Sequence, residues 1–148
     1  MKEFHEGNDG FFLKFETFAE MKRALEKIFA TGSVVIIATM AKPCGQRTCK
    51  EIMGKAKTRK EALNQLVELL NKQNWGELSL FDVDFKRGSG RVIVKNSFEA
   101  RKCRSKTPCC HFFANFIAGF ISELFAKNVT VKEEKCAGKG DAHCEFRF

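Results

Sequence analysis

Glu133, Cys136 and Cys144 have the residue types and the spacing of a small metal site. Cys136 and Cys144 flank a short segment, AGKGDA, whose glycines and aspartate are typical of a turn. We expect the segments on either side, 129–135 and 142–148, to form a closing hairpin. Thiolate sulfur and carboxylate oxygen are both zinc ligands, so this hairpin predicts metal binding.

The alternation of side chains along the hairpin directs these ligands toward the core. Side chains two positions apart share one face of a strand. Glu133 therefore shares the face of Val129 and Val131, and Cys144 shares the face of Phe146. A buried carboxylate is very costly unless a cation or several donors meet it. A single buried cysteine is commonly a plain apolar core residue, but its combination with an inward glutamate favours a metal.

A fourth zinc ligand must come from another element. The candidates are Cys109 and Cys110, at the start of the apolar segment 108–126, which we expect to be the central helix. Thr107 is expected to cap this helix, and Pro108 to occupy its first turn. Neighbouring helical residues point about 100° apart, so only one thiol faces the site. The helical phase favours Cys110 slightly and leaves Cys109 open.

The remaining cysteines predict less chemistry. Cys44 and Cys49 form a Cys-x4-Cys pair that, with Cys103 and Cys109, is a candidate for a second metal site, and nearby Lys42 suits a reactive thiol. We interpret them as ordinary thiols. The chain does not begin with the apolar stretch of a signal peptide, so we expect a cytoplasmic protein in which disulfides are uncommon.

Periodicity predicts the elements that position these residues. Helices are expected at 17–31, 45–55, 59–74 and 108–126, and strands at 33–40, 77–86, 90–98, 129–135 and 142–148. Two pairs, Thr17 with Glu20 and Thr58 with Glu61, resemble capping boxes. The run 33–40, SVVIIATM, is rich in β-branched residues, as buried strands are.

The element order αβααββαββ predicts one α+β domain over residues 1–148, with an antiparallel sheet flanked by helices. A chain of 148 residues that is 44% hydrophobic can close such a core. It lacks a run of about 18 apolar residues, so we expect no membrane span. The net charge is +8, concentrated in 42–60 and 86–106. Aromatic residues do not alternate with these cations as on a stacking platform, so we interpret them as solvated and do not expect a nucleic-acid partner.

The central helix also carries candidates for a ligand site. Its apolar side chains, together with one from the hairpin, would line either a pocket or a solid core, and the sequence does not separate the two. These residues are Phe113, Ile117, Phe120 and Val131. A polar stripe on the same helix, which we interpret as its solvent edge, consists of His111, Asn115 and Ser122.

Three stretches between residues 92 and 148 follow the pattern of a known family: VIVKNSFEA, CCHFFANFIAGF and VKEEKCAGKGDAHCEF. The pattern is a strand ending near Asn-Ser, a Cys opening a Gly-containing helix, then Glu-x2-Cys and a Gly-Asp turn leading to a final Cys. With these features the chain resembles the vinyl-4-reductase domain family. Relatives include sensor domains of aromatic-hydrocarbon-responsive transcription activators, proteins of bacteriochlorophyll synthesis and stand-alone archaeal proteins.

The resemblance implies a fold similar to vesicle-tethering TRAPP subunits. In the sensors three Cys and one Glu bind zinc, which implies a zinc site at Cys110, Glu133, Cys136 and Cys144. The family pattern thereby selects Cys110 over Cys109. The phenol-reading sensors use a His and a Trp for which the sequence places no equivalent, so phenol recognition is not implied.

We therefore expect a zinc-stabilised, cytoplasmic domain that binds a small hydrophobic or aromatic compound, acts through a regulatory protein partner or a homodimer, and is not an enzyme. Lys135 and Lys139 are expected to offset part of the negative charge of the metal site. One alternative is an enzyme or accessory protein of tetrapyrrole vinyl reduction, although no nucleotide-binding Gly-rich loop is present. The other is a basic protein that binds polyanions, which predicts strong salt dependence.

Overall fold

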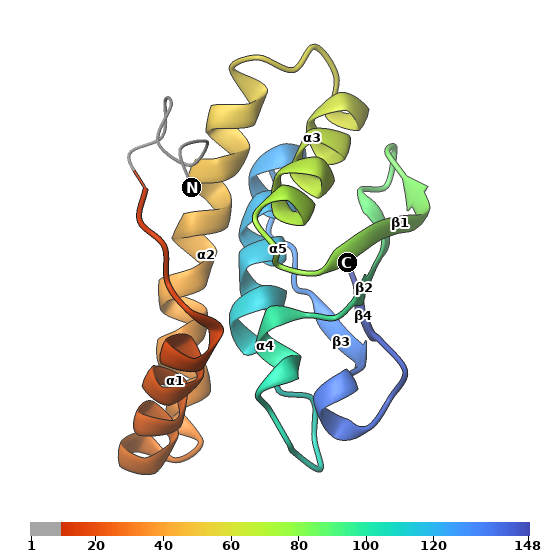
Figure 1. Ribbon diagram of the computed structural model, residues 1–148. Coiled ribbons are helices and arrows are strands. Elements are labelled where there is room, and N and C mark those ends of the chain that lie inside the picture. The colour runs from red at the N-terminus through yellow and green to blue at the C-terminus, as the bar shows by residue number, and fades with distance from the viewer. Residues whose placement is uncertain (1–9) are drawn as a thin grey trace.

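The computed structural model describes residues 10–148 (Figure 1). The elements run α1 (Phe15–Phe29), α2 (Gly32–Met53), α3 (Arg59–Lys72), β1 (Glu77–Asp84), β2 (Ser89–Lys95), α4 (Phe98–Arg101), α5 (His111–Phe125), β3 (Lys132–Lys135), the 3-10 turn η2 (Ala137–Lys139) and β4 (Cys144–Arg147). Helices and an antiparallel sheet together confirm the predicted α+β class.

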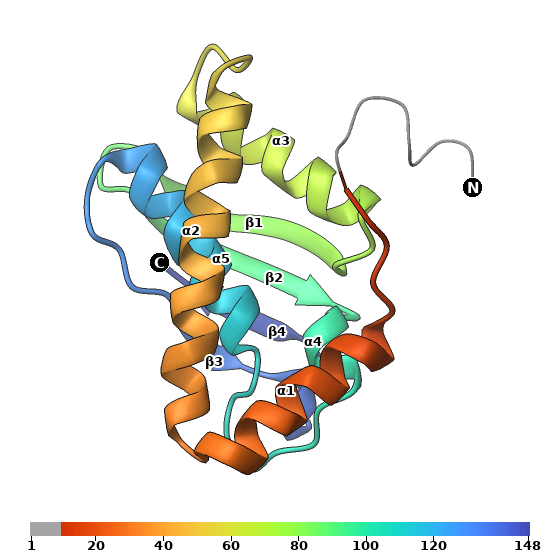
Figure 2. The same ribbon diagram turned by 90° about the vertical axis from the view of Figure 1, so that its left-hand side faces the viewer.

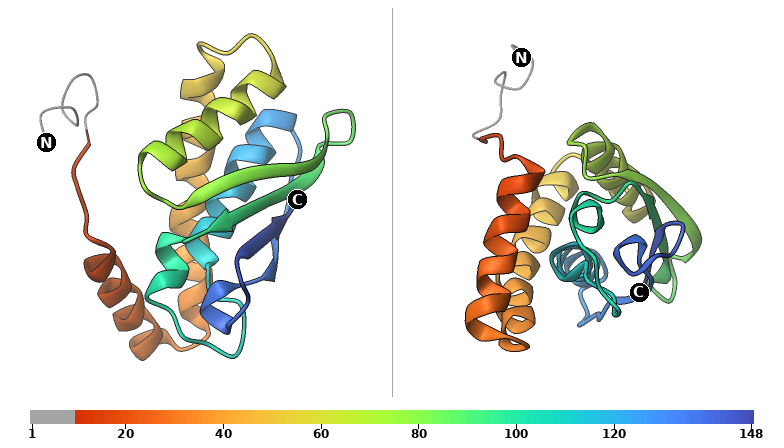
Figure 3. Two further views of the ribbon diagram at one scale, coloured as in Figure 1. Left: turned by 45° about the vertical axis from the view of Figure 1, so that its right-hand side comes forward. Right: turned by 60° about the horizontal axis from the view of Figure 1, so that its bottom comes forward.

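The four strands pair in the order β1-β2-β4-β3, and every pair is antiparallel. Helix α5 lies between this sheet and α2, while α1 and α2 form the outer layer on the side away from the sheet (Figure 2, Figure 3). In the centre of the sheet Val94 pairs with Cys144, and Val92 pairs with Phe146. The last strand therefore brings Cys144 next to the first turn of the central helix.

The strand predicted at 33–40 is wrong. These residues lie in the 22-residue helix α2, which also absorbs the short helix predicted at 45–55. The buried residues of α2 include a row at every fourth position: Ser33, Ile37, Ala41, Gly45 and Cys49. This spacing is one face of a helix, whereas a strand exposed on one face would bury every second residue. Packing against α5 has overridden the strand preference of the β-branched residues, as tertiary contacts commonly do.

Helices α2 and α5 touch backbone to backbone through one glycine from each. A Cβ atom on Gly45 would lie 2.0 Å from the Phe116 carbonyl oxygen, and a Cβ on Gly119 would lie 2.1 Å from the Lys42 carbonyl oxygen. No side chain fits at either position unless the helices separate. The two glycines thus set the distance between the outer helical layer and the central helix.

The predicted start of the central helix is also wrong. Helix α5 begins at His111, with Cys110 rather than Thr107 as its N-cap residue. The Glu99 carboxylate of α4 accepts hydrogen bonds from the Phe112 and Phe113 amides at 3.1 and 2.8 Å. A carboxylate here satisfies free N–H groups and complements the positive end of the helix dipole.

Glu99 is itself buried and forms an ion pair with the buried Lys22 of α1, at 2.8 Å. The same Lys22 ammonium donates to the Cys109 carbonyl. This ion pair ties α1 to the loop in front of α5. The sequence alone had indicated neither residue, although Glu99 is an isolated acid within the basic stretch 86–106.

Of the two expected capping boxes, the second is confirmed as a side-chain cap. Thr58 Oγ1 accepts from the Glu61 amide at 3.1 Å, and the Glu61 carboxylate accepts from the Lys57 amide at 2.9 Å. The first is wrong, because α1 starts before Thr17, at Phe15, and has no side-chain cap. Within residues 10–148, none of the helices combines the length and the hydrophobicity needed to cross a bilayer.

Candidate metal centre

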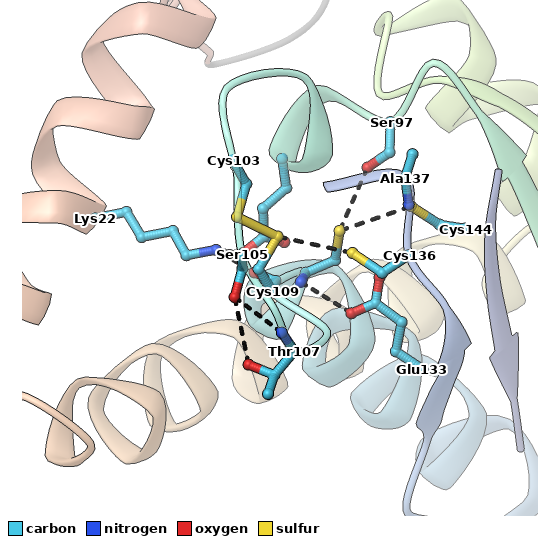
Figure 4. Close-up of a disulfide and its surroundings, with 12 residues drawn as sticks. Lys22, Ser97, Cys103, Ser105, Thr107, Cys109, Glu133, Cys136, Ala137 and Cys144 are labelled. Carbon is cyan, nitrogen blue, oxygen red and sulfur yellow. Dashed lines mark hydrogen bonds and ion pairs between the residues drawn. A yellow bond between two sulfur atoms is a disulfide. The ribbon is translucent and has the colours of Figure 1, made fainter. Parts of the chain in front are cut away.

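Four potential metal ligands meet where the first turn of α5 faces the final hairpin (Figure 4). Cys110 is the N-cap residue of α5, Glu133 lies in β3, Cys136 precedes η2, and Cys144 opens β4. Their three sulfur atoms and one carboxylate oxygen all lie within 4.8 Å of one another. Among the residues that the structure describes, no other group of three or more such side chains is arranged to hold a metal.

The spacing of these atoms suits a tetrahedral ion. Four sulfur-type donors at about 2.3 Å from one ion stand about 3.8 Å apart at the corners of a tetrahedron. The Cys110 and Cys144 sulfur atoms are 3.8 Å apart. The side chains of Cys110, Cys136 and Cys144 belong to residues that are fully buried, at 0% exposure. The cluster is therefore closed to solvent on its sulfur side.

Glu133 points into the cluster, as its strand alternation predicted. Its Oε2 atom accepts a hydrogen bond from the Cys110 amide at 2.9 Å. Its Oε1 atom is buried and has no hydrogen-bond partner within the described residues. A buried oxygen without a partner is costly, and a cation at the centre of the cluster would satisfy it. The donor set and this oxygen both fit a bound metal ion.

The protonation of the cluster also calls for a cation. Burial, together with a hydrogen bond to Cys136, raises the pKa of Glu133 to about 8. The Cys110 pKa is raised by its hydrogen bonds to Cys136 and Cys144 and by burial. The pKa of Cys136 is lowered, because Cys110 and Cys144 hydrogen-bond to its thiolate. Without a metal the site therefore favours a single thiolate, because several buried negative charges repel one another.

Backbone amides complete the surroundings of the hairpin sulfurs. The Ala137 amide donates to Cys144 Sγ at 3.4 Å, and the Asp141 carboxylate accepts from the Cys136 amide at 2.8 Å. The lysines expected to offset the charge of the site pair elsewhere. Lys139 pairs with Asp141 at 3.4 Å, and Lys135 pairs with Glu145 at 3.6 Å.

The structure brings Cys110 into the cluster and leaves Cys109 outside it. Cys109 forms a disulfide with Cys103, although we expected disulfides to be uncommon. The Cys109 sulfur still lies 3.7 Å from that of Cys136. Cys44 and Cys49 lie on α2 and join no metal-binding group in residues 10–148, so the second metal site considered from the sequence is not assembled there.

The apolar ligand-site candidates form packed core in this conformation. Phe113, Ile117 and Phe120 are buried, Val131 is half-buried, and the Phe113 ring stacks on that of Phe146 with centroids 5.0 Å apart. The sole tryptophan, Trp75, contacts a ring of phenylalanines that surrounds one end of α5: Phe98, Phe112, Phe113 and Phe116.

The polar stripe of α5 is not a simple solvent edge. Ser122 is buried, and its hydroxyl accepts from the Val129 amide at 3.0 Å. Asn115 and His111 are half-buried, and the Asn115 side chain donates to the His111 carbonyl at 2.7 Å. Only Asn115 reaches a surface hollow, which it shares with residues of α2. The interpretation of these three residues as one exposed edge is therefore wrong at Ser122.

The fold and the site define an α+β domain whose central helix and final hairpin share three thiols and a carboxyl group. Residues 91–148 match the vinyl-4-reductase domain, and this match confirms the resemblance found in the sequence. Two proteins of Methanocaldococcus jannaschii are similar. Uncharacterized protein MJ1642 is 34% identical over 91 residues, and uncharacterized protein MJ0150 is 30% identical over 116 residues.

The matches cover 55% and 78% of this chain, respectively. The chain spans only 56% of the length of MJ1642 and 64% of that of MJ0150. These relatives therefore support a shared domain and not a shared whole protein.

Two solved structures share the fold. The phenol-responsive sensory domain of the transcription activator PoxR, solved with phenol, has a TM-score of 0.84 at 17% identity, covering 93% of this chain and 75% of that one. A trafficking protein particle complex subunit 3 from Naegleria fowleri, covalently bound to palmitic acid, has a TM-score of 0.61 at 14% identity, covering 90% and 92%. At these identities the likeness concerns the fold alone.

Proposed function

We propose that the chain is a zinc-stabilised domain that binds a small hydrophobic or aromatic compound in the cytoplasm and passes the signal to a partner protein or to a second copy of itself. The observation that carries the metal part is the cluster of Cys110, Glu133, Cys136 and Cys144, together with the unpartnered Glu133 oxygen. The sensory fold of a phenol-responsive domain supports the ligand part.

Zinc suits this donor set better than a hard cation does. Thiolates select soft and borderline metals, whereas magnesium and calcium prefer oxygen. Four protein ligands fill a tetrahedral zinc site and leave no open position for a substrate, so we assign the ion a structural role. When bound, it would cross-link the N-terminus of α5 to the final hairpin.

The affinity for zinc should fall steeply as the pH falls, because zinc must displace the protons held by Glu133 and Cys110. Each displaced proton lowers the affinity about tenfold per pH unit below the pKa of its group. Competition titrations with a chelator of known affinity, from about pH 8 down to about pH 6, would measure this slope. Glu133→Gln should make the slope shallower by about one proton. An affinity that does not vary with pH would contradict the protonation of the site.

The ligand would bind between α5 and the sheet, against the candidate residues Phe113, Ile117, Phe120 and Val131. These side chains are packed in the described conformation, so binding would require the aromatic rings to move apart. Trp75 contacts Phe113 with ring centroids 5.7 Å apart. Because it is the only tryptophan of the chain, its fluorescence reports on this region.

Phenol, toluene and related compounds should raise the melting temperature of the zinc-loaded protein and change the Trp75 emission. A ligand at a hundredfold excess over its Kd stabilises the folded state by about 2.7 kcal/mol. Phe113→Leu should weaken binding roughly fivefold, because an aromatic pair contributes about 1 kcal/mol. The matched variant Phe81→Leu alters an exposed ring, 49% accessible, and should leave binding unchanged. A broad panel without any thermal or fluorescence response would remove the ligand part of the proposal.

Exposed apolar side chains on the outer helical layer support the partner or dimer part. Large examples before and along α1 and α2 are Phe11, Phe12, Met21, Ile28, Phe29, Val35 and Met40. Extensive exposed apolar surface commonly marks a protein contact. Light scattering of the zinc-loaded protein, with Val35→Glu for comparison, tests self-association directly. A monomer at all concentrations would favour a different protein as the partner.

A further inference from the structure

We propose that the Cys103–Cys109 disulfide and the Cys136 thiolate form a thiol–disulfide exchange site, in which loss of the metal moves the disulfide onto Cys136. The inference rests on the proposed function, because it takes Cys136 as a metal ligand. It assigns a chemical role to Cys103 and Cys109, which the metal cluster does not use.

The three sulfur atoms are arranged for exchange. Cys109 Sγ is bonded to Cys103 Sγ and lies 3.7 Å from Cys136 Sγ. Figure 4 shows the three atoms in a row, in the order Cys103, Cys109, Cys136. A thiolate attacks a disulfide along the sulfur–sulfur axis and expels the far sulfur. Cys136 is therefore placed as the attacking group and Cys103 as the leaving group.

Several contacts hold the disulfide against the hairpin. A Cβ atom on Gly138 would lie 2.6 Å from Cys109 Sγ and 3.2 Å from the Cys103 Cβ, so the absence of a side chain there permits the approach. The Ser105 amide donates to the Gly138 carbonyl at 3.0 Å. On the other side, the buried Lys22 ammonium donates to the Cys109 carbonyl. The sulfur atoms are thus brought together by contacts on both sides of the loop.

The exchange balances without an added oxidant. The Cys136 thiolate attacks Cys109 Sγ, the Cys109–Cys136 bond forms and the Cys103–Cys109 bond breaks. Cys103 leaves as a thiolate and takes a proton from water. The number of disulfides is unchanged. The half-buried Cys103 stands between the exposed cations Lys102 and Arg104, which favour a negatively charged leaving group.

A bound metal would block this step. A thiolate that donates its electrons to zinc is a poorer nucleophile, and a Cys136 that has entered a disulfide is lost as a ligand. Metal retention and disulfide migration are therefore mutually exclusive states of the same residue. Loss of zinc would be recorded as a change of disulfide partner, with a free thiol appearing at Cys103.

The test follows the disulfide linkage in the full chain before and after removal of zinc. Protein oxidised in air and loaded with zinc is analysed for metal content, then treated with a strong chelator without oxygen or reductant. Acid quenching, alkylation and peptide mass spectrometry identify the linkage. We expect Cys103–Cys109 in the loaded protein and Cys109–Cys136 after chelation, with Cys103 newly alkylated. Excluding oxygen prevents direct oxidation of Cys110 with Cys144, whose sulfur atoms are 3.8 Å apart.

Two variants sharpen the outcome. Cys103→Ser should keep zinc and show no migration, and Gly138→Ala should slow migration because its methyl group displaces the disulfide. A Cys103–Cys109 linkage that survives chelation, or migration at equal rates with and without zinc, overturns the inference. Absence of zinc in the loading step instead overturns the proposed metal site, so the two failures are distinguished by metal analysis alone.

Discussion

Cys144→Ser is expected to leave the purified protein without zinc and to lower its stability more than any other single change considered. Cys144 is fully buried, and its sulfur lies 3.8 Å from that of Cys110. Structural zinc contributes about 10–16 kcal/mol of apparent binding free energy in small zinc-finger peptides, so a loss of at least about 5 kcal/mol is expected here. Elemental analysis of protein purified without added metal, together with thermal unfolding, measures both effects.

Cys44→Ser is the matched control for this substitution. Cys44 is half-buried on α2, and its thiol donates to the Met40 carbonyl at 3.2 Å, a bond that a serine hydroxyl can replace. This variant should keep one zinc per chain and a nearly unchanged melting temperature. A Glu133→Ala, Cys136→Ala double variant should lose zinc as Cys144→Ser does. If Cys144→Ser retained zinc and its melting temperature, the site as drawn would be wrong.

Gly119→Ala is expected to produce the second large effect, without any change in the metal ligands. The added methyl group would lie 2.1 Å from the Lys42 carbonyl oxygen, which belongs to the backbone of α2 and cannot rotate away. Helices α2 and α5 would have to move apart along their whole contact. Overpacking a core usually costs about 1–3 kcal/mol and occasionally more, and we expect the upper end, about 3 kcal/mol. Denaturant unfolding of the zinc-loaded protein measures the loss.

Gly54→Ala serves as the control because it makes the same chemical change at the end of α2. A Cβ atom at Gly54 would meet the Glu51 carbonyl at 3.4 Å, an ordinary contact, and the backbone φ there is −63°. Alanine should therefore be neutral or slightly stabilising at this position. Equal stabilities of the Gly119 and Gly54 variants would show that α2 and α5 do not touch through their backbones.

Much of the site could be predicted because its information is local. Strand alternation alone directed Glu133 and Cys144 to one side, and the short turn between Cys136 and Cys144 predicted a hairpin. The structure has this hairpin, with Glu133 paired to Phe146 across β3 and β4. The α+β class followed from the same local patterns, and the family resemblance in the C-terminal segment was confirmed by the match to the vinyl-4-reductase domain.

The sequence by itself determined which residues are suited to metal chemistry and where most helices and strands lie, because composition and periodicity act over a few neighbouring residues. Tertiary structure decided the rest. The run 33–40 became helical because α5 offered a surface for a row of buried residues four apart. Cys110 entered the cluster because Glu99, held by the distant Lys22, caps α5 at the following residues. Contacts between residues far apart in the chain carry free energies that no local pattern contains.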